Sequence, residues 1–192
     1  MKKALKVVLI ILVALIVVFV ALVALIGSND SDTTKNMTPE EIKTTAGEKD
    51  LEIARSVWSA QQYQVKLADK VQTMSTGETD LLDVYSYAGE TKDFVGNLLT
   101  TVKAIDMADG TAAEYQDAAE GYISTVYMIA NDLRDYIDNE KHSSLEAVQK
   151  NLQIIPTAET QFLDARTAYL KDAGFTDDEI ANRPTLDSGE DK

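Results

Sequence analysis

The sequence predicts an all-α protein in which an N-terminal transmembrane helix precedes an up-down-up-down antiparallel four-helix bundle. Three observations lead to this fold class. An uninterrupted apolar run occupies residues 7–26, apolar residues recur with heptad spacing from residue 51 onward, and short polar turns divide the heptad region into four segments. Heptad spacing keeps one stripe of each helix facing its neighbours, whereas a strand would need alternation of apolar and polar residues.

Residues 7–26 are the predicted transmembrane anchor, after a stub at residues 1–6. At a rise of about 1.5 Å per residue the run spans roughly 30 Å, the thickness of the hydrocarbon core of a bilayer. A secretory signal peptide is the alternative, but its apolar region is shorter, and Leu22 and Leu25 do not fit a cleavage site that needs small residues. Lysines precede the run and aspartates follow it, so we expect a cytoplasmic N-terminus and an extracytoplasmic domain in the cell membrane.

Residues 27–50 are predicted to be a polar linker, because Ser, Thr, Asp, Glu and Lys replace the apolar residues there. Within this linker, Thr38, Pro39 and Glu41 form a helix-start signal. Thr38 supplies a capping hydroxyl, Pro39 suits the first helical position, and Glu41 supplies a carboxylate in the first turn. We therefore expect a short helix that begins at residue 39 and ends before Gly47.

The bundle is predicted at residues 51–174, with helices at about 51–75, 80–109, 112–140 and 144–173. The first three helices carry apolar series that alternate three- and four-residue steps without a slip. The series of the first helix runs through Ile53, Val57, Ala60, Gln64, Leu67, Val71 and Met74. Because the connections are short, consecutive helices are expected to run antiparallel.

The fourth helix departs from the regular series at Pro156. A heptad continued past Ile155 would reach Glu159 and Arg166, whereas one extra three-residue step gives an apolar stripe through Ala158, Phe162, Ala165 and Tyr169. Proline also removes the amide that would bond to Leu152. The sequence therefore predicts a bend at Pro156, with the helix continuing to about Ala173.

Residues 175–192 are predicted to form a short helix followed by a disordered acidic tail. Thr176 and Glu179 have the spacing of a capping box, and Phe175 can pack on Leu170 or Ile180. The tail is expected to begin at Asn182.

Composition excludes several classes of function. The chain contains no Cys, which removes disulfides, thiolate nucleophiles and the usual zinc sites. Its net charge of −14 disfavours nucleic acid as a partner, because nucleic-acid binding needs clustered Lys and Arg. No phosphate loop, His-Glu-x-x-His motif or nucleophile elbow occurs, so we expect no catalytic residues, no metal site, no cofactor and no enzyme activity.

Two sets of residues are candidate sites. Helix lengths place Gln64, Thr91 and Pro156 near one level in mid-bundle, where they could border a small-ligand cavity. The alternative is a buried hydrogen bond between Gln64 and Thr91 that fixes helix register. A second candidate is a partner-binding aromatic patch away from the seams, which would consist of Trp58, Tyr63, Tyr85, Tyr87 and Tyr127.

The predicted function is that of a membrane-anchored extracytoplasmic interaction or scaffold module, with a protein partner at the cell surface or in the membrane. The alternative is a small-ligand-sensing bundle that relays its state through a membrane partner, because a stub of residues 1–6 is too short for a signalling domain. The layout of a short stub, one anchor and an external helical bundle resembles that of LemA-type membrane proteins and of chemoreceptor sensor modules. The resemblance is one of organisation and carries no site residues across.

Overall fold

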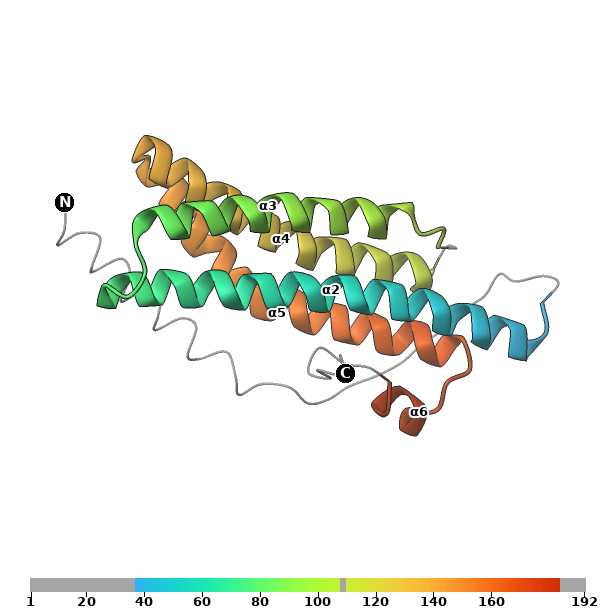
Figure 1. Ribbon diagram of the computed structural model, residues 1–192. Helices are drawn as coiled ribbons and strands as arrows, with labels where there is room; N and C mark the ends of the chain where they lie inside the picture. Colours follow the sequence, from blue (N-terminus) through green and yellow to red (C-terminus); the bar gives the residue numbers. More distant parts are fainter. Residues whose placement is uncertain (1–36, 108–109, 184–192) are drawn as a thin grey trace.

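The computed structural model describes residues 37–107 and 110–183, and its described residues form helices without any strand. Four long helices pack together, as expected: α2 (Pro39–Thr76), α3 (Leu81–Ala104), α4 (Thr111–Asn139) and α5 (His142–Asp172). A short helix, α6 (Asp177–Ala181), follows. Successive long helices run in alternating directions, and α6 lies beside the start of α2 (Figure 1). The all-α prediction is thus confirmed for the described part of the chain.

The predicted anchor at residues 7–26 lies outside the described residues, as do the stub and the first part of the linker. Among the residues that the structure describes, every helix is too short or too polar to cross a bilayer.

The expectation of a polar linker up to residue 50 is wrong for its second half, because α2 begins at Pro39 and continues through Gly47 without a break. The helix-start signal is correct. The backbone N–H of Thr38 donates to the Glu41 carboxylate at 2.8 Å, and the N–H of Glu41 donates to the Thr38 hydroxyl at 3.3 Å. The helix persists because its polar first turns include core positions: Asp50 is buried one turn before Ile53, and Ala46 is buried two turns before it.

The connections differ from the predicted helix bounds by a few residues. Gly77 ends α2 in the left-handed conformation, with a φ of 84°, as its position suggests. Helix α4, the third of the bundle, starts at Thr111, within one residue of the predicted start. Helix α3, the second, ends at Ala104 rather than at 109. The Gln116 side chain accounts for this early end. Its amide donates to the carbonyls of Val102 and Ile105, at 2.7 and 2.8 Å, and so provides the hydrogen bonds that another turn of α3 would otherwise supply. Helix α5 begins at His142 rather than 144.

The core follows the predicted seams. Buried seam residues include Val57, Leu67, Val84, Val95, Tyr115, Tyr122, Val126, Val148, Ile155 and Phe162. Beyond Pro156 the predicted core residues Ala158, Phe162 and Tyr169 are buried. The extra three-residue step is wrong, because Asn151 is buried and Leu152 is only half-buried, so the buried positions from Val148 to Phe162 keep regular heptad spacing. Arg166, which the step was expected to move off the core face, is nevertheless only 4% exposed.

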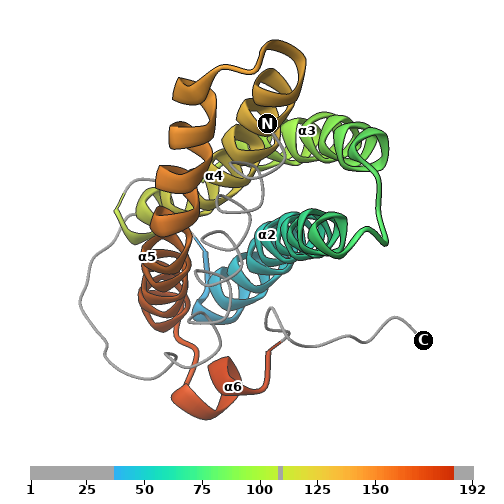
Figure 2. The same cartoon turned by 90° about the vertical axis from the view of Figure 1, so that its left-hand side faces the viewer.

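Helix α5 continues through Pro156, which is exposed, and changes direction near its middle, where Pro156 lies (Figures 1 and 2). Proline removes one hydrogen bond of the helix ladder and crowds the preceding turn, so a bend is its ordinary consequence. The first half of α5 leans toward α4 and away from α2, and α5 packs far more closely on α4 than on α2 (Figure 2).

The C-terminal helix α6 forms as predicted. The Thr176 N–H donates to the Glu179 carboxylate at 2.8 Å, and the Glu179 N–H donates to the Thr176 hydroxyl at 3.3 Å. The expectation of a disordered tail from Asn182 is wrong at its first residues, because Asn182 caps α6 and Arg183 reaches back to α2. Residues 184–192 lie outside the described part of the chain.

Candidate functional site

The mid-bundle level does not form the predicted hydrogen bond. Thr91 is fully buried, but its hydroxyl donates to the carbonyl of Tyr87 in its own helix at 2.7 Å. Gln64 is half-buried and Pro156 is exposed. None of the hydrogen bonds within the described residues joins Gln64 to Thr91, because the Thr91 hydroxyl is already satisfied one turn back in α3.

A small cavity does lie beside Gln64. Its volume is about 20 Å³, and α2, α4 and α5 line it, chiefly with apolar side chains. Neither Thr91 nor Pro156 reaches it. A space of this size holds about one water molecule. This cavity therefore gives no support to a small-molecule site at the predicted level.

Helix α4 carries a buried hydroxyl without a hydrogen-bond partner among the described residues. The Tyr122 side chain is fully buried, and its hydroxyl makes no hydrogen bond within the described residues. Burial, and then the negative charge of Glu159, raise the pKa of Tyr122 well above its ordinary value. Gln61 donates to Glu159 at 3.4 Å across the gap between α2 and α5.

The predicted aromatic residues separate into distinct groups. Tyr63 of α2 stacks on two rings of α3: its centroid lies 5.8 Å from that of Tyr87, with an interplanar angle of 8°, and 4.3 Å from that of Phe94, at 17°. The Tyr63 hydroxyl donates to Glu90 at 3.3 Å. We call Tyr63, Tyr87 and Phe94 the aromatic row. It joins α2 to α3, and Phe94 keeps 36% of its surface exposed.

A lysine side chain already contacts one ring of the aromatic row. The Lys70 ammonium lies 5.4 Å from the centroid of the Tyr87 ring, a distance typical of cation–π contacts. Burial, followed by the charges of Tyr63 and Glu90, raises the pKa of Tyr87 to about 12. The row therefore stays uncharged at neutral pH and combines ring surface with the carboxylate of Glu90.

The other predicted aromatics serve contacts within the bundle. Tyr85 lies 4.5 Å from the Arg134 guanidinium, accepts a hydrogen bond from it at 2.6 Å, and donates to Asp138 at 3.1 Å. Tyr127 packs so closely on Gly96 that a Cβ there would lie 3.4 Å from the ring. Trp58 is half-buried against the core.

The five residues therefore do not form one patch: only Tyr63 and Tyr87 come together. Phe94 is the member that sequence reasoning missed. Its spacing of seven residues from Tyr87 on one helix face could have indicated it.

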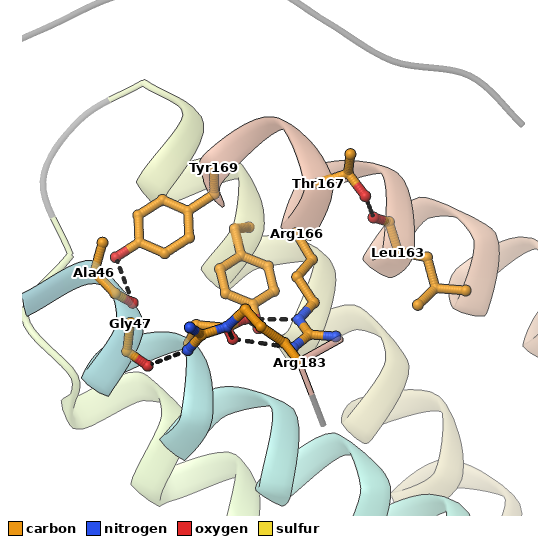
Figure 3. A network of polar contacts seen from close by, with 9 residues as sticks. Ala46, Gly47, Leu163, Arg166, Thr167, Tyr169 and Arg183 are labelled. Carbon is orange, nitrogen blue, oxygen red and sulfur yellow. Dashed lines mark hydrogen bonds and ion pairs between the residues drawn. The ribbon is translucent and has the colours of Figure 1, made fainter. Parts of the chain in front are cut away.

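The most extensive polar site is a buried cluster around Asp50, which is 0% exposed (Figure 3). Arg166 binds both of its oxygens: Nε lies 2.6 Å from Oδ1 and Nη2 lies 3.0 Å from Oδ2. The Tyr115 hydroxyl donates to Oδ1 at 3.0 Å, and Arg183 Nε donates to Oδ2 at 2.8 Å. The cluster thus joins α2, α4, α5 and the residues that follow α6.

The two arginines of the cluster keep its buried carboxylate ionised. Burial alone would raise the pKa of Asp50, but the hydrogen bonds and positive charges of Arg166 and Arg183 outweigh it and hold that pKa below its ordinary value. Burial, and then the nearby Asp50 carboxylate, raise the pKa of the Tyr115 phenol. At neutral pH the cluster therefore contains an ionised carboxylate, two guanidinium groups and a neutral phenol.

Sequence reasoning missed this cluster, although a signal existed. Asp50 fell in the expected linker and Arg183 in the expected tail. Counting the seam of α2 backward from Ile53 reaches Asp50, and the unbroken heptad of α5 reaches Arg166. Opposite charges at two seam positions are typical of a buried ion pair.

The segment from Gly174 to Arg183, which we call the C-terminal strap, covers the start of α2. Arg183 Nη2 donates to the carbonyl of Gly47 at 2.6 Å, and the Phe175 ring lies 4.7 Å from the guanidinium of Arg183. Lys43 pairs with Glu179 at 2.6 Å. That hydrogen bond, with those of Thr176, lowers the pKa of Glu179 to about 2.

The Asp135 carboxylate also has several protein partners. Asp135, in the acidic end of α4, accepts hydrogen bonds from Ser144 at 2.5 Å, Asn139 at 2.7 Å and Lys141 at 3.2 Å. Over residues 37–107 and 110–183, no three carboxylate or imidazole groups are arranged to hold a metal ion.

The chain matches no protein-family model, and no curated protein or solved structure is significantly similar to it.

Proposed function

We propose that this chain is a membrane-anchored, extracytoplasmic, non-catalytic interaction module that binds a protein partner through the aromatic row of α2 and α3. The observation that carries the proposal is the exposure of Phe94 at the end of a stacked row of aromatic rings. Exposed aromatic side chains that are held rigid contribute large contact area at little entropic cost, and they are enriched at protein interfaces.

The chemistry of the row indicates the kind of partner surface. Phe94 and Tyr63 offer ring surface, Glu90 offers a carboxylate beside them, and the Tyr87 ring already attracts the Lys70 ammonium. An acidic chain with a net charge of −14 also favours a basic partner. We infer a partner surface that combines apolar groups with lysine or arginine.

The rest of the bundle suits a scaffold. The buried cluster around Asp50 ties the first and last bundle helices together, so that α2 and α3 present the aromatic row from a fixed frame. The predicted anchor at residues 7–26 supports placement at the membrane surface, where two tethered proteins meet at high effective concentration.

The test compares Phe94→Ala with a matched control in the full chain, expressed in its own cells. Ile154 of α5 is 38% exposed, which is nearly the same as Phe94, so Ile154→Ala removes an equivalent side chain from another helix. We expect in-cell cross-linking and mass spectrometry to recover a partner with the unmodified chain and with Ile154→Ala, and much less of it with Phe94→Ala. Equal recovery with both variants would refute the proposed contact face.

A ligand-sensing bundle predicts a different result. A small molecule that binds only the folded chain would raise its melting temperature, without dependence on Phe94.

A further inference from the structure

The residues around Arg183 form a site that is matched to a guanidinium group. Asp50 supplies a carboxylate oxygen 2.8 Å from Nε, Gly47 supplies a carbonyl oxygen 2.6 Å from Nη2, and Phe175 supplies a ring face 4.7 Å away. A carboxylate, a carbonyl and a ring together match the planar, forked arrangement of donors that distinguishes arginine from lysine.

Gly47 makes room for the guanidinium. A Cβ built at this position would lie 3.3 Å from the Phe175 ring and 3.4 Å from each terminal nitrogen of Arg183. The 3.3 Å contact is tighter than an ordinary van der Waals distance and the 3.4 Å contacts are at its limit, so a larger residue would force the ring or the guanidinium to shift by a few tenths of an ångström. The glycine therefore has a steric role that its position inside a helix, where glycine is unfavourable, would not otherwise explain.

The receiving half of the site does not depend on Arg183. Arg166 and Tyr115 hold the Asp50 carboxylate by three hydrogen bonds of 2.6, 3.0 and 3.0 Å. Departure of Arg183 would leave Asp50 paired with Arg166 rather than as an uncompensated buried charge. The carboxylate is thus oriented in advance, and its charge is balanced with or without the second guanidinium.

The strap that carries Arg183 is weakly attached. Helix α6 has 5 residues, none of which is buried, and a helix of this length does not persist without tertiary support. The Lys43–Glu179 pair is solvent-exposed, and exposed ion pairs contribute little to stability. Attachment of the strap therefore depends mainly on Arg183 and on the partly buried side chains of Phe175 and Ile180.

From these observations we propose that Asp50 and the Gly47 carbonyl form an arginine-binding site, which Arg183 fills when the strap is closed and which accepts an arginine side chain of a protein partner when the strap opens. The site lies on α2 beneath the strap and shares no residue with the aromatic row, so the inference goes beyond the proposed function and stands apart from it.

The test begins with Arg183→Ala in the full chain, reconstituted in lipid nanodiscs. We expect this variant to melt about 2 to 4 °C below the unmodified chain, which is the shift that a loss of roughly 1 kcal/mol produces in a domain of this size. Ethylguanidinium at millimolar concentration should restore part of that loss, whereas ethylammonium at the same ionic strength should not. Arg55→Ala, which removes an exposed arginine of α2, is the control and should respond to neither compound.

A second arm tests arginine presented by a protein chain. A short peptide that copies residues 181–184, with its single arginine, should raise the melting temperature of Arg183→Ala, and the same peptide with lysine in place of arginine should not. Three results would each overturn the proposal: no restoration by ethylguanidinium, equal restoration by ethylammonium, or restoration by ethylguanidinium without any response to the arginine peptide.

Discussion

Arg166 Nε lies 2.6 Å from Oδ1 of Asp50, and this buried contact joins the first long helix of the bundle to the last one. The two residues are far apart in the sequence, and both are almost completely buried. An intact buried ion pair contributes little net free energy to folding, because the cost of removing both charges from water offsets their attraction. Removing one partner is costly, because the other charge is then buried without a counter-charge.

Asp50→Asn should therefore destabilise the bundle strongly. The asparagine amide is neutral and leaves the Arg166 guanidinium without a compensating charge, at a cost of about 3 to 5 kcal/mol in the free energy of unfolding. Urea titration followed by circular dichroism measures this change. Asp117→Asn, at an exposed position of α4, is the control and should leave the midpoint where it is.

The pH dependence of stability follows from the same carboxylate. The pKa of Asp50 is lower in the folded chain than its ordinary value of 3.8, so its contribution is fully present above about pH 4 and is lost as the pH falls through the folded pKa. The difference in unfolding free energy between the unmodified chain and Asp50→Asn should consequently shrink as the pH falls below about 4. A difference that stays constant throughout this range would contradict the assignment of an ionised, paired Asp50.

Pro156 gives a prediction of the opposite sign. It is exposed within α5, and Pro156→Ala restores an amide that can donate to the carbonyl of Leu152. We expect the variant to be more stable by about 1 kcal/mol or more, since proline in a helix interior is disfavoured by about 3 kcal/mol relative to alanine. Thr157→Ala is the neighbouring control. Destabilisation by Pro156→Ala would instead mean that the apolar stripe needs the bend to stay in phase.

The seams of the four helices could be predicted from the sequence because heptad spacing is a local property. Val57, Val95, Val126 and Phe162 are buried where the series places them. Core positions beyond Pro156 could also be predicted, since apolar residues recur there with heptad spacing. Local patterns of this kind need no knowledge of which helices touch.

The buried cluster could not be predicted in the same way, because each of its residues is recognised only when its partner on another segment has been placed. From the sequence alone, Asp50 resembles a polar linker residue, and its contact with Arg166 of α5 shows that it belongs to the core. Arg183 likewise resembles a tail residue, and its contact with Asp50 shows that it belongs to the cluster. The aromatic row has the same character: Tyr63 lies on α2, and its stacking partners lie on α3. The missing information was the pairing of helix faces.

The predicted anchor and orientation have a direct test, because the chain contains no Cys and single cysteines can be introduced as reporters. Thr157→Cys should react with a membrane-impermeant maleimide in intact cells, since residue 157 is exposed on the domain. Lys3→Cys, in the stub, should react only after the cells are permeabilised. The reverse pattern would mean the opposite orientation, and labelling of both positions in soluble extract would mean that residues 7–26 are not an anchor.

The proposed contact face has the most direct test in site-specific photo-cross-linking within cells. A photo-reactive phenylalanine analogue at residue 94 replaces a ring by a ring and so preserves the stacking on Tyr63, while the same analogue at residue 154 reports on α5. We predict a discrete cross-linked protein from residue 94 and none from residue 154. Cross-links of equal yield from both positions, or from residue 154 alone, would contradict a protein partner at the aromatic row.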